Sequence, residues 1–434
     1  MAIRLNYLDT SFEREFAAFL TTKREVSEDV NAAVRAIIDD VRARGDAALA
    51  DYSARFDRID FNTTGMAVTP AEIDQAIQAV APEVLGALKV AAIRIEAHHR
   101  RQLPKDDLYE DAMGVGLGSR WTPIDAVGLY VPGGTASYPS SVLMNALPAK
   151  VAGVPRIVMV VPASNGAINP AVLAAARLAG VEEIYRIGGA QAVAALAYGT
   201  ETIAPVAKIV GPGNAYVAAA KRQVFGTVGI DMIAGPSEVL VIADGDNDPD
   251  WIAADLLAQA EHDAGAQAIL ITDDAAFGDA VEKAVERQLK TLPRAETAAA
   301  SWRDFGAIIL VPDLDKAVPL ANRVAPEHLE LAIADPDAMV PKVRNAGAIF
   351  IGRHTPEVIG DYVGGSNHVL PTARSARFSS GLGVLDYMKR TSILRLGSDQ
   401  LRALGPAAIA LAQSEGLEAH ARSVAIRLNL GGEG

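Results

Sequence analysis

The chain has 434 residues and a formal net charge of −13; hydrophobic residues make up 50% of it and charged residues 21%. This balance is typical of a folded globular protein with two or three domains and a large core. The acidic charge argues against non-specific nucleic-acid binding, because such binding depends on Lys and Arg neutralising phosphates.

Cysteine is absent, which excludes disulfides, thiolate zinc sites and a cysteine nucleophile. A metal site would therefore have to use His, carboxylate and amide oxygen. An aldehyde could not be oxidised here through a thiohemiacetal. The N-terminal stretch lacks the apolar core of a secretory signal, and no apolar run of about 18 residues predicts a membrane span. The expected location is the cytoplasm.

The N-terminal part is predicted to be a short arm followed by two long helices. The arm covers residues 1–23, and its apolar anchors would be Leu5, Leu8, Phe12 and Phe16. Apolar residues at helical spacing predict a helix over 26–56. A second helix opens with the Thr-Pro-Ala-Glu sequence at Thr69, which suits a capping box, and runs to about Arg101.

From about Gly114 onward, short apolar strands are predicted to alternate with helices, which indicates βαβ units and parallel sheets in two successive blocks. The predicted strands are 126–131, 156–161, 183–187, 208–210, 239–243, 266–272, 306–311 and 348–351. Residues 371–395 are rich in Ser, Gly and Arg and are predicted to be an ordered loop or linker. A helical tail over 398–428 follows.

Three of the predicted strands end in glycine-rich turns that lead into helices, namely Gly133-Gly134, Gly188-Gly189 and Gly211-Pro212-Gly213. Glycine lets backbone N–H groups approach a phosphate at a helix N-terminus. Asn214, after the third turn, is a suitable N-cap. None of the turns matches G-x-G-x-x-G. Two interpretations therefore stay open: a nucleotide-type ligand, or the ordinary turns of an α/β protein.

The stretch 255–263 (DLLAQAEHD) predicts an amphipathic helix near the junction of the two blocks. Gln259 and His262 are three residues apart, so they share one helix face. An amide oxygen and an imidazole on one rigid face are a suitable start for a metal site. The alternative interpretation is a solvated helix end that happens to carry one His.

Further polar groups follow in the second half of the chain. Glu327 and His328 come directly after Pro326; a carboxylate beside an imidazole suits proton transfer, and the alternative is a helix N-terminus with Pro and Glu in its first turn. The glycine-rich loop 360–368 carries Asp361 and His368. It suits either ligand binding or a surface turn.

His420 lies in the helical tail. Together with Gln259, His262 and Asp361 it would complete a four-ligand N/O site suited to Zn²⁺ or a similar divalent ion. These positions are spread over about 160 residues, so only the fold can bring them together. The three histidines that sit among Arg, Thr and Pro are interpreted as solvent-facing: His98, His99 and His354.

Over essentially its whole length, the chain resembles the histidinol dehydrogenases, a zinc-dependent, NAD-linked family of the last steps of histidine biosynthesis. The motifs that carry the resemblance are GLYVPGGTASYPSSVLMNALPAKVAGV from Gly128, VGPGNAYVAAAKRQVFG from Val210, DMIAGPSEVLVIAD from Asp231, LLAQAEHD from Leu256, RVAPEHLEL from Arg323, GDYVGGSNHVLPT from Gly360 and SEGLEAHARS from Ser414.

The resemblance implies a role for each matching residue. Zn²⁺, one ion per subunit, would be held by Gln259, His262, Asp361 and His420. Substrate contacts would fall on Ser237, Gln259, His262, His328, Asp361, His368, Glu415 and His420. NAD contacts would fall on Tyr130, Gln191 and Asn214. Glu327 and His328 would be the catalytic proton-transfer pair.

The fold implied by the resemblance is α/β, with two incomplete Rossmann-like, aldehyde-dehydrogenase-like domains, the second inserted in the first. An N-terminal arm would cover 1–23. The first α/β domain, 24–129 with 237–381, would carry the metal and substrate site, and the second, 130–236, would bind NAD. The C-terminal helical extension, 382–434, would serve dimerisation. The active form would be a homodimer in which His420 and Glu415 cross the interface.

The implied reaction is a four-electron oxidation of L-histidinol to L-histidine through L-histidinaldehyde, with two NAD⁺ reduced. His328 would accept the hydroxyl proton, and Glu327 would activate the water that hydrates the aldehyde. Two alternatives are kept. One is a related zinc- and NAD-dependent dehydrogenase of another small polar primary alcohol, and the other is a non-catalytic nucleotide- or metal-binding protein.

Overall fold

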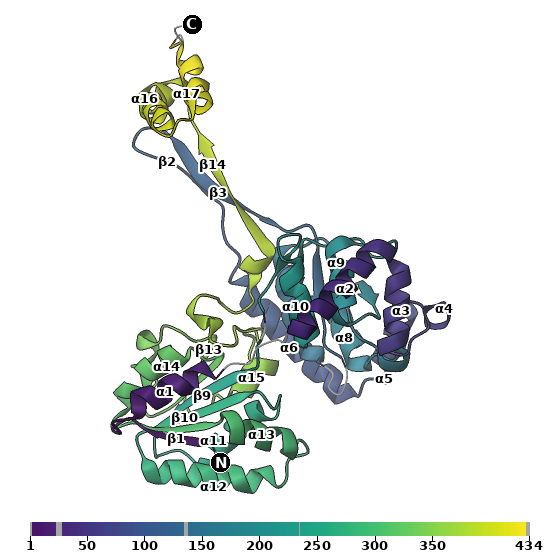
Figure 1. The fold of residues 1–434 in the computed structure, drawn as a ribbon, viewed down its shortest axis with the longest axis vertical. Helices are drawn as coiled ribbons and strands as arrows, with labels where there is room; N and C mark the ends of the chain where they lie inside the picture. The colour runs from purple at the N-terminus through teal and green to yellow at the C-terminus, as the bar shows by residue number, and fades with distance from the viewer. Residues whose placement is uncertain (1, 23–27, 134–137, 234, 431–434) are drawn as a thin grey trace. The chain divides into compact units, whose positions relative to one another are not determined.

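The computed structural model describes residues 2–22, 28–133, 138–233 and 235–430, and Figure 1 shows the ribbon. The chain divides into two compact units: Met1–Gln102 with Asp125–Tyr387, and Leu103–Ile124 with Met388–Gly434. Predictions that concern residues 1, 23–27, 134–137, 234 and 431–434 lie outside the described residues.

A six-stranded parallel sheet in the order β1-β11-β10-β9-β12-β13 forms the first lobe of the larger unit (Figure 1). Alternate residues of its strands face opposite cores: Leu240 packs on one side and Val241 on the other. Its strands are β1 (Ile3–Asn6), β9 (Glu238–Ala243), β10 (Gln267–Thr272), β11 (Ala307–Leu310), β12 (His328–Ala332) and β13 (Ala348–Ile351). Its helices are α1 (Phe12–Thr21), α11 (Pro249–Ala260), α12 (Ala275–Leu289), α13 (Ala295–Phe305), α14 (Ala317–Val324) and α15 (Glu357–Tyr362).

A five-stranded parallel sheet in the order β6-β5-β4-β7-β8 forms the second lobe of the same unit. Its strands are β4 (Val127–Tyr130), β5 (Ile157–Val160), β6 (Glu183–Tyr185), β7 (Lys208–Val210) and β8 (Gly229–Ile230). The helices between them are α7 (Pro139–Ala152), α8 (Pro170–Ala179), α9 (Gly189–Tyr198) and α10 (Ala215–Val224). Because this sheet lies in the chain between β1 and β9, the predicted α/β fold with one sheet inserted in the other is confirmed.

The helices that precede β4 pack on the second lobe. They are α2 (Glu28–Arg44), α3 (Asp46–Phe56), α4 (Phe61–Thr64), α5 (Pro70–Ala79) and α6 (Pro82–Arg100). Val34 and Leu49 share a buried core with Leu196 of α9. The grouping of 24–129 with 237–381 in one domain stays a prediction. α2 packs on α9 and α10, whereas α5 packs on α8 and α6 on α7 and α8, and helical spacing alone does not reveal these partners.

Local rules explain how these helices begin and end. Gly45, with φ +54°, separates α2 from α3, so the single helix predicted over 26–56 is two. The capping box at the start of α5 is confirmed, because the Thr69 side chain accepts from the Glu72 N–H and the Glu72 carboxylate accepts from the Thr69 N–H at 2.8 Å. The helix breaks after Ala79 and α6 begins at Pro82, so the second predicted helix, from Thr69 to about Arg101, is also two helices.

The N-terminal arm adds a strand to the first lobe. β1 pairs with β11 in parallel register, and Phe12 and Phe16 of α1 are buried beneath the sheet. The predicted anchors at Leu5, Phe12 and Phe16 are therefore confirmed. Leu8 is 72% exposed, and the prediction that it anchors the arm is wrong, because it falls in the turn between β1 and α1.

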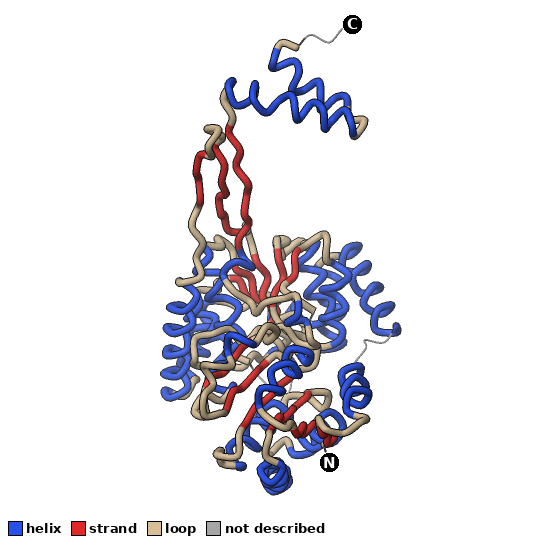
Figure 2. The backbone as a smooth tube through the Cα atoms, turned by 90° about the vertical axis from the view of Figure 1, so that its left-hand side faces the viewer, coloured by secondary structure: helices blue, strands red, loops and turns tan. Residues whose placement is uncertain are grey.

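The smaller unit consists of an antiparallel ribbon and a helical hairpin (Figure 2). The strands are β2 (Asp107–Glu110), β3 (Gly116–Pro123) and β14 (Met388–Arg395), and the helices are α16 (Ser398–Ser414) and α17 (Glu418–Ala425). The helical tail is confirmed. The predicted loop over 371–395 is wrong at its C-terminal end, where β14 forms. The strand went undetected because its residues are mostly exposed and carry little apolar pattern.

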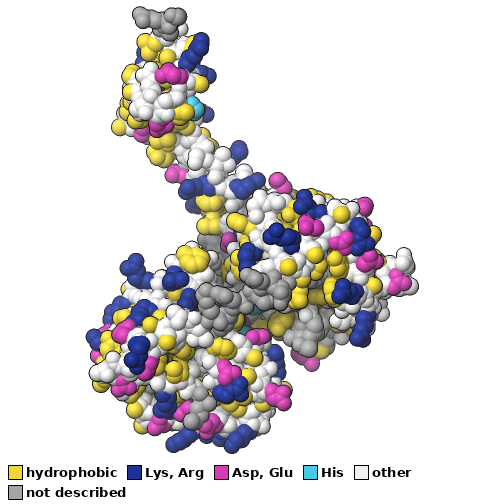
Figure 3. Space-filling view, in the orientation of Figure 1, with side chains coloured by type: hydrophobic (Ala, Val, Ile, Leu, Met, Phe, Trp, Pro, Cys, Tyr) yellow, Lys and Arg dark blue, Asp and Glu magenta, His cyan; other side chains and the backbone are white. Residues whose placement is uncertain are grey.

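Charged side chains of both signs are interspersed over the face of the lobes seen in Figure 3. The described residues contain no single helix that is both long and apolar enough to cross a membrane. Only the pair α5 and α6 meets the length and composition criteria together, and it is bent by 114°.

Candidate active site

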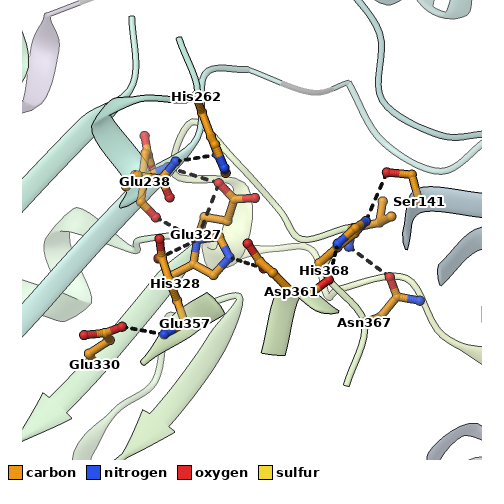
Figure 4. A network of polar contacts seen from close by, with 12 residues as sticks. Ser141, Glu238, His262, Glu327, His328, Glu330, Glu357, Asp361, Asn367 and His368 are labelled. Atoms are coloured by element: carbon orange, nitrogen blue, oxygen red, sulfur yellow. Dashed lines mark hydrogen bonds and ion pairs between the residues drawn. The ribbon is translucent and has the colours of Figure 1, made fainter. Parts of the chain in front are cut away.

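The predicted catalytic pair lies where β12 begins beside β9. Glu327 and His328 are both buried, and His328 is the first residue of β12 (Figure 4). Pairing between β12 and β9 begins at His328 opposite Val239. The backbone N–H and carbonyl of Glu238, one residue earlier in β9, therefore bond side chains instead of β12. The Glu238 N–H donates to Glu327 Oε2 at 3.0 Å, and His328 Nδ1 donates to the Glu238 carbonyl at 3.2 Å. One residue of β9 thus orients both side chains, through its N–H and its carbonyl. The alternative of a helix N-terminus at Glu327 is wrong.

Three carboxylates surround the His328 ring. Glu357 Oε2 lies 3.4 Å and Glu327 Oε2 3.9 Å from Nδ1, and Asp361 Oδ1 lies 3.4 Å from Nε2. Burial by itself lowers the pKa of His328, but the three negative charges outweigh it and raise the pKa well above its ordinary value. The Phe350 ring, 5.8 Å away between centroids, forms an apolar wall. The imidazole is thus surrounded by groups that favour its protonated form.

Glu327 has the properties of a general base. Burial raises the pKa of its carboxyl, while the charge of His328, the Glu238 N–H and the Ser237 side chain act in the opposite direction. A raised pKa makes a carboxylate a stronger proton acceptor. Ser237 directly precedes β9, and its contact with Glu327 brings this predicted substrate residue to the pair.

A deeper layer of three carboxyl groups, which the sequence does not predict, lies behind His328. Glu330 is two residues along β12 from His328, so both face the same side of the sheet. Glu357 is four residues before Asp361 on α15, and its N–H donates to Glu330 Oε1 at 2.6 Å. Burial raises the pKa of Glu357 to about 8, that of Asp255 on α11 to about 6, and that of Glu330 well above its usual range.

Gln259 and His262, the predicted metal-binding pair, are in contact. Gln259 is fully buried near the end of α11, and its Nε2 lies 3.2 Å from His262 Nδ1. Its Oε1 is buried and has no hydrogen-bond partner within the described part of the chain. His262 is exposed in the turn after the helix end, so the solvated-face interpretation holds for one member of the pair and not for the other.

Asp361 completes the part of the predicted metal site that the larger unit contains. Burial opposes its ionisation, but His328, together with His368 and His262, lowers the pKa of Asp361 below its ordinary value. Asp361 lies on α15 and not in a loop as expected. Gly360 allows this placement, because a Cβ at that position would lie 2.5 Å from the Phe350 ring.

The unpartnered Gln259 oxygen, the exposed imidazole of His262 and the ionised Asp361 are the donor types that a borderline divalent cation accepts. In donor chemistry, these three residues suit a zinc ion. Within the described residues, no group of three or more His, Asp or Glu side chains is arranged to hold a metal. His420 and Glu415 lie in the smaller unit, on α17 and at the end of α16, and both are exposed.

His368 links the site to the second lobe. Its Nδ1 donates to the Asp361 carbonyl at 2.9 Å, and its Nε2 lies 3.2 Å from Ser141 Oγ on α7 (Figure 4). Nearby, the Asn367 side chain donates to the Met144 carbonyl at 2.7 Å. His99, interpreted as solvent-facing, is instead fully buried, and its Nδ1 lies 2.7 Å from the Ile95 carbonyl.

The residues predicted to contact NAD lie at the carboxyl edge of the second sheet. In the order β6-β5-β4-β7-β8, the chain runs outward from β4 to β6 and then returns to β7 on the other side of β4. Ligands of open parallel sheets bind at such a switch point, beyond the carboxyl ends of the two strands. Tyr130 ends β4, and the turn from Gly211 to Asn214 follows β7. Gln191 lies buried in the first turn of α9.

Two of these residues already satisfy helix N-termini. The Tyr130 hydroxyl accepts from the Gly189 N–H at 3.0 Å, and burial raises the pKa of Tyr130 to about 12. The Asn214 side chain accepts from the N–H groups of Tyr216 and Val217 at 3.0 and 3.2 Å, which confirms it as an N-cap. A phosphate at either helix would therefore find part of the donor set occupied.

Comparison with known proteins is consistent across sequence and structure. The family model for histidinol dehydrogenase matches residues 20–428. A histidinol dehydrogenase of Rhizobium meliloti is 94% identical over 434 residues, all of both chains, and one of Agrobacterium fabrum is 79% identical over 429 residues, 99% of both. A crystal structure of histidinol dehydrogenase from Elizabethkingia anophelis matches with a TM-score of 0.94 at 37% identity, covering 99% of this chain and 98% of that one.

Proposed function

Because this chain belongs to the histidinol dehydrogenase family, we propose that it oxidises L-histidinol to L-histidine through L-histidinaldehyde, with two NAD⁺ reduced. The observation that carries the proposal is the buried Glu327–His328 pair, which Glu238 of β9 orients through its N–H and its carbonyl, with Asp361 Oδ1 3.4 Å from His328 Nε2. Oxidation of an alcohol to a carboxylate needs an acceptor for the hydroxyl proton and a base for the water that hydrates the aldehyde, and a bound cation can hold the substrate beside them. The family supplies the identity of the alcohol.

In the first oxidation His328 is the proton acceptor. Its Nδ1 hydrogen is committed to the Glu238 carbonyl, so in the neutral imidazole it is Nε2, 3.4 Å from Asp361 Oδ1, that carries the lone pair for the proton. The substrate hydroxyl gives its proton to Nε2 as hydride leaves the carbinol carbon for NAD⁺. Glu327, whose Oε2 lies 3.9 Å from Nδ1, stabilises the imidazolium that forms.

In the second oxidation Glu327 is the base. Water adds to the aldehyde carbon as Glu327 takes one of its protons, and the hydrate then loses hydride to a second NAD⁺. The Glu238 N–H and the Ser237 side chain hold the carboxylate in place, and burial keeps its proton affinity high. Oxidation through a hydrate needs no thiol nucleophile, which suits a chain without cysteine.

A zinc ion in this site would be held by Gln259, His262 and Asp361, with His420 as the fourth ligand. When bound, it would fix the substrate's amine and imidazole and so orient the carbinol for hydride loss. The support in this chain is the buried Gln259 Oε1, which has no protein partner among the described residues. His368, held between Asp361 and Ser141, is positioned to contact the substrate.

We further propose that His420 and Glu415 act on the site of a second chain in a homodimer. Both residues are exposed in the smaller unit. This unit also exposes large apolar side chains on its strands and helices, among them Leu394, Leu411 and Ile426, each more than 60% exposed. Apolar surface of this kind marks an association site. NAD would bind the second lobe at Tyr130, Gln191 and Asn214.

A panel of primary alcohols tests the proposal. The purified protein with Zn²⁺ and NAD⁺ should reduce NAD⁺ with L-histidinol and should react far more weakly with other small amino alcohols. A different preferred alcohol would support the alternative of a related dehydrogenase. If NAD⁺ and Zn²⁺ bind but every alcohol fails, the non-catalytic alternative stands.

A further inference from the structure

The second lobe contains a buried ion pair that the proposed chemistry does not use. Lys221 of α10 and Asp231, the residue after β8, are paired with side chains only 3% and 1% exposed. Removing two charges from water is costly, and replacing such a pair by apolar residues is often neutral or stabilising. The pair is therefore poorly explained as a source of stability.

What the pair holds is a single glycine. The Gly211 N–H donates to Asp231 Oδ2 at 2.7 Å, and Lys221 Nζ donates to the Gly211 carbonyl at 3.0 Å. The other carboxylate oxygen of Asp231 accepts from the same ammonium. The three contacts form a closed ring, so both polar groups of Gly211 are fixed by charged partners.

Gly211 occupies the switch point of the sheet. It follows β7 directly, and a Cβ at this position would lie 2.1 Å from the carbonyl oxygen of Tyr130, the last residue of β4. Its φ of +112° is also a conformation that L side chains rarely adopt. The turn therefore approaches β4 so closely that no side chain fits at position 211. Its conformation sets where Asn214, three residues on, begins α10.

We propose that Lys221 and Asp231 are positioning residues for the cofactor turn: they hold Gly211 so that the turn to Asn214 and the end of β4 at Tyr130 present one fixed surface to NAD⁺. This inference rests on the NAD-dependent function proposed above. Neither residue is suggested to touch the cofactor. Hydrogen bonds from the two charged side chains fix the directions of the Gly211 N–H and carbonyl, whereas apolar packing is non-directional.

The test uses the double variant Lys221→Met/Asp231→Leu, which removes both charges and leaves no unpaired buried ion. Asp231→Asn alone would strand a buried ammonium and would be expected to destabilise the lobe. The matched control is Arg156→Met/Glu183→Gln. That pair, 2.8 Å apart, precedes β5 and opens β6 at the amino edge of the same sheet, away from the turn.

Two readouts separate positioning from simple support of the fold. Hydrogen exchange in residues 208–216, measured without NAD⁺, should be faster in the double variant than in the control. Calorimetric NAD⁺ binding should weaken by about tenfold, a change of about 1.4 kcal/mol, and the KM for NAD⁺ should rise to match. The kcat at saturating NAD⁺ and the KM for L-histidinol should stay within about twofold of the unsubstituted protein.

Unchanged exchange in the turn, or NAD⁺ affinity equal to that of the control in a folded double variant, would overturn the proposal. An equal fall in kcat and affinity together with lower thermal stability would also count against it, because that is the result of general loosening. Calorimetry on the unsubstituted protein separates the two proposals: if that protein binds no NAD⁺, the proposed function fails along with this inference.

Discussion

Replacement of Glu357 by Gln tests the buried acidic layer behind His328. The carboxyl is 1% exposed, its Oε2 has no hydrogen-bond partner among the described residues, and burial raises its pKa to about 8 from an ordinary 4.5. Between these two values the folded protein binds about one proton more than the unfolded chain, so stability falls as pH rises through this window. Gln resembles the protonated acid in shape and has no proton to lose.

The variant should therefore lose much of that pH dependence. A shift of this size carried by one group amounts to on the order of 5 kcal/mol. Asp255 and Glu330 also have raised pKa values and share the burial cost. We accordingly expect Glu357→Gln to gain about 2–4 kcal/mol over the unsubstituted protein at pH 8, and little at pH 5.

Urea unfolding at about pH 5, 6.5 and 8, with a chelator present to remove metal linkage, measures the effect. Glu286→Gln on α12 is the matched control, because it removes one exposed carboxyl and leaves the buried layer untouched. Parallel stability curves for the Glu357 variant and the unsubstituted protein across this pH range would refute the reasoning.

Three further substitutions test the site. His262→Asn should lose bound zinc and activity with an unchanged circular dichroism spectrum, since no strand depends on this exposed residue; undiminished zinc would remove it from the ligand set. Glu327→Gln keeps the acceptor for the Glu238 N–H and should slow aldehyde oxidation by about 10²–10⁴-fold, more than it slows alcohol oxidation; equal losses in the two half-reactions would argue against its role as the base. Heterodimers of His420→Ala and His262→Asn chains should regain part of the activity, and no recovery after verified subunit exchange would contradict shared sites.

The apolar pattern predicts eight strands, each of which overlaps an observed strand of the two parallel sheets, but it does not predict β1, β8 or β12. β12 was missed for a physical reason. Pro326 and Glu327 favour a helix start locally, and only the pairing of His328 with Val239 on one side and Ala348 on the other makes the segment a strand. Polar residues at the start of a central strand have no local signal of burial.

The same limit applies to the carboxyl layer. Asp255, Glu330 and Glu357 resemble ordinary solvent-facing charges in the sequence, and they become a cluster only when α11, β12 and α15 meet. The alternation His328-Leu329-Glu330-Leu331 did contain a clue, because strand periodicity places the two polar residues on one face. Gln259 and His262 were paired from their spacing, whereas the burial of Gln259 needed the fold.

The NADH yield from limiting L-histidinol tests the central claim most directly. With Zn²⁺ and excess NAD⁺, each molecule of L-histidinol consumed should give about two molecules of NADH and one of L-histidine, because alcohol and aldehyde are oxidised in the same site. A yield of about one NADH with accumulation of the aldehyde, or no NADH at all, would contradict the account.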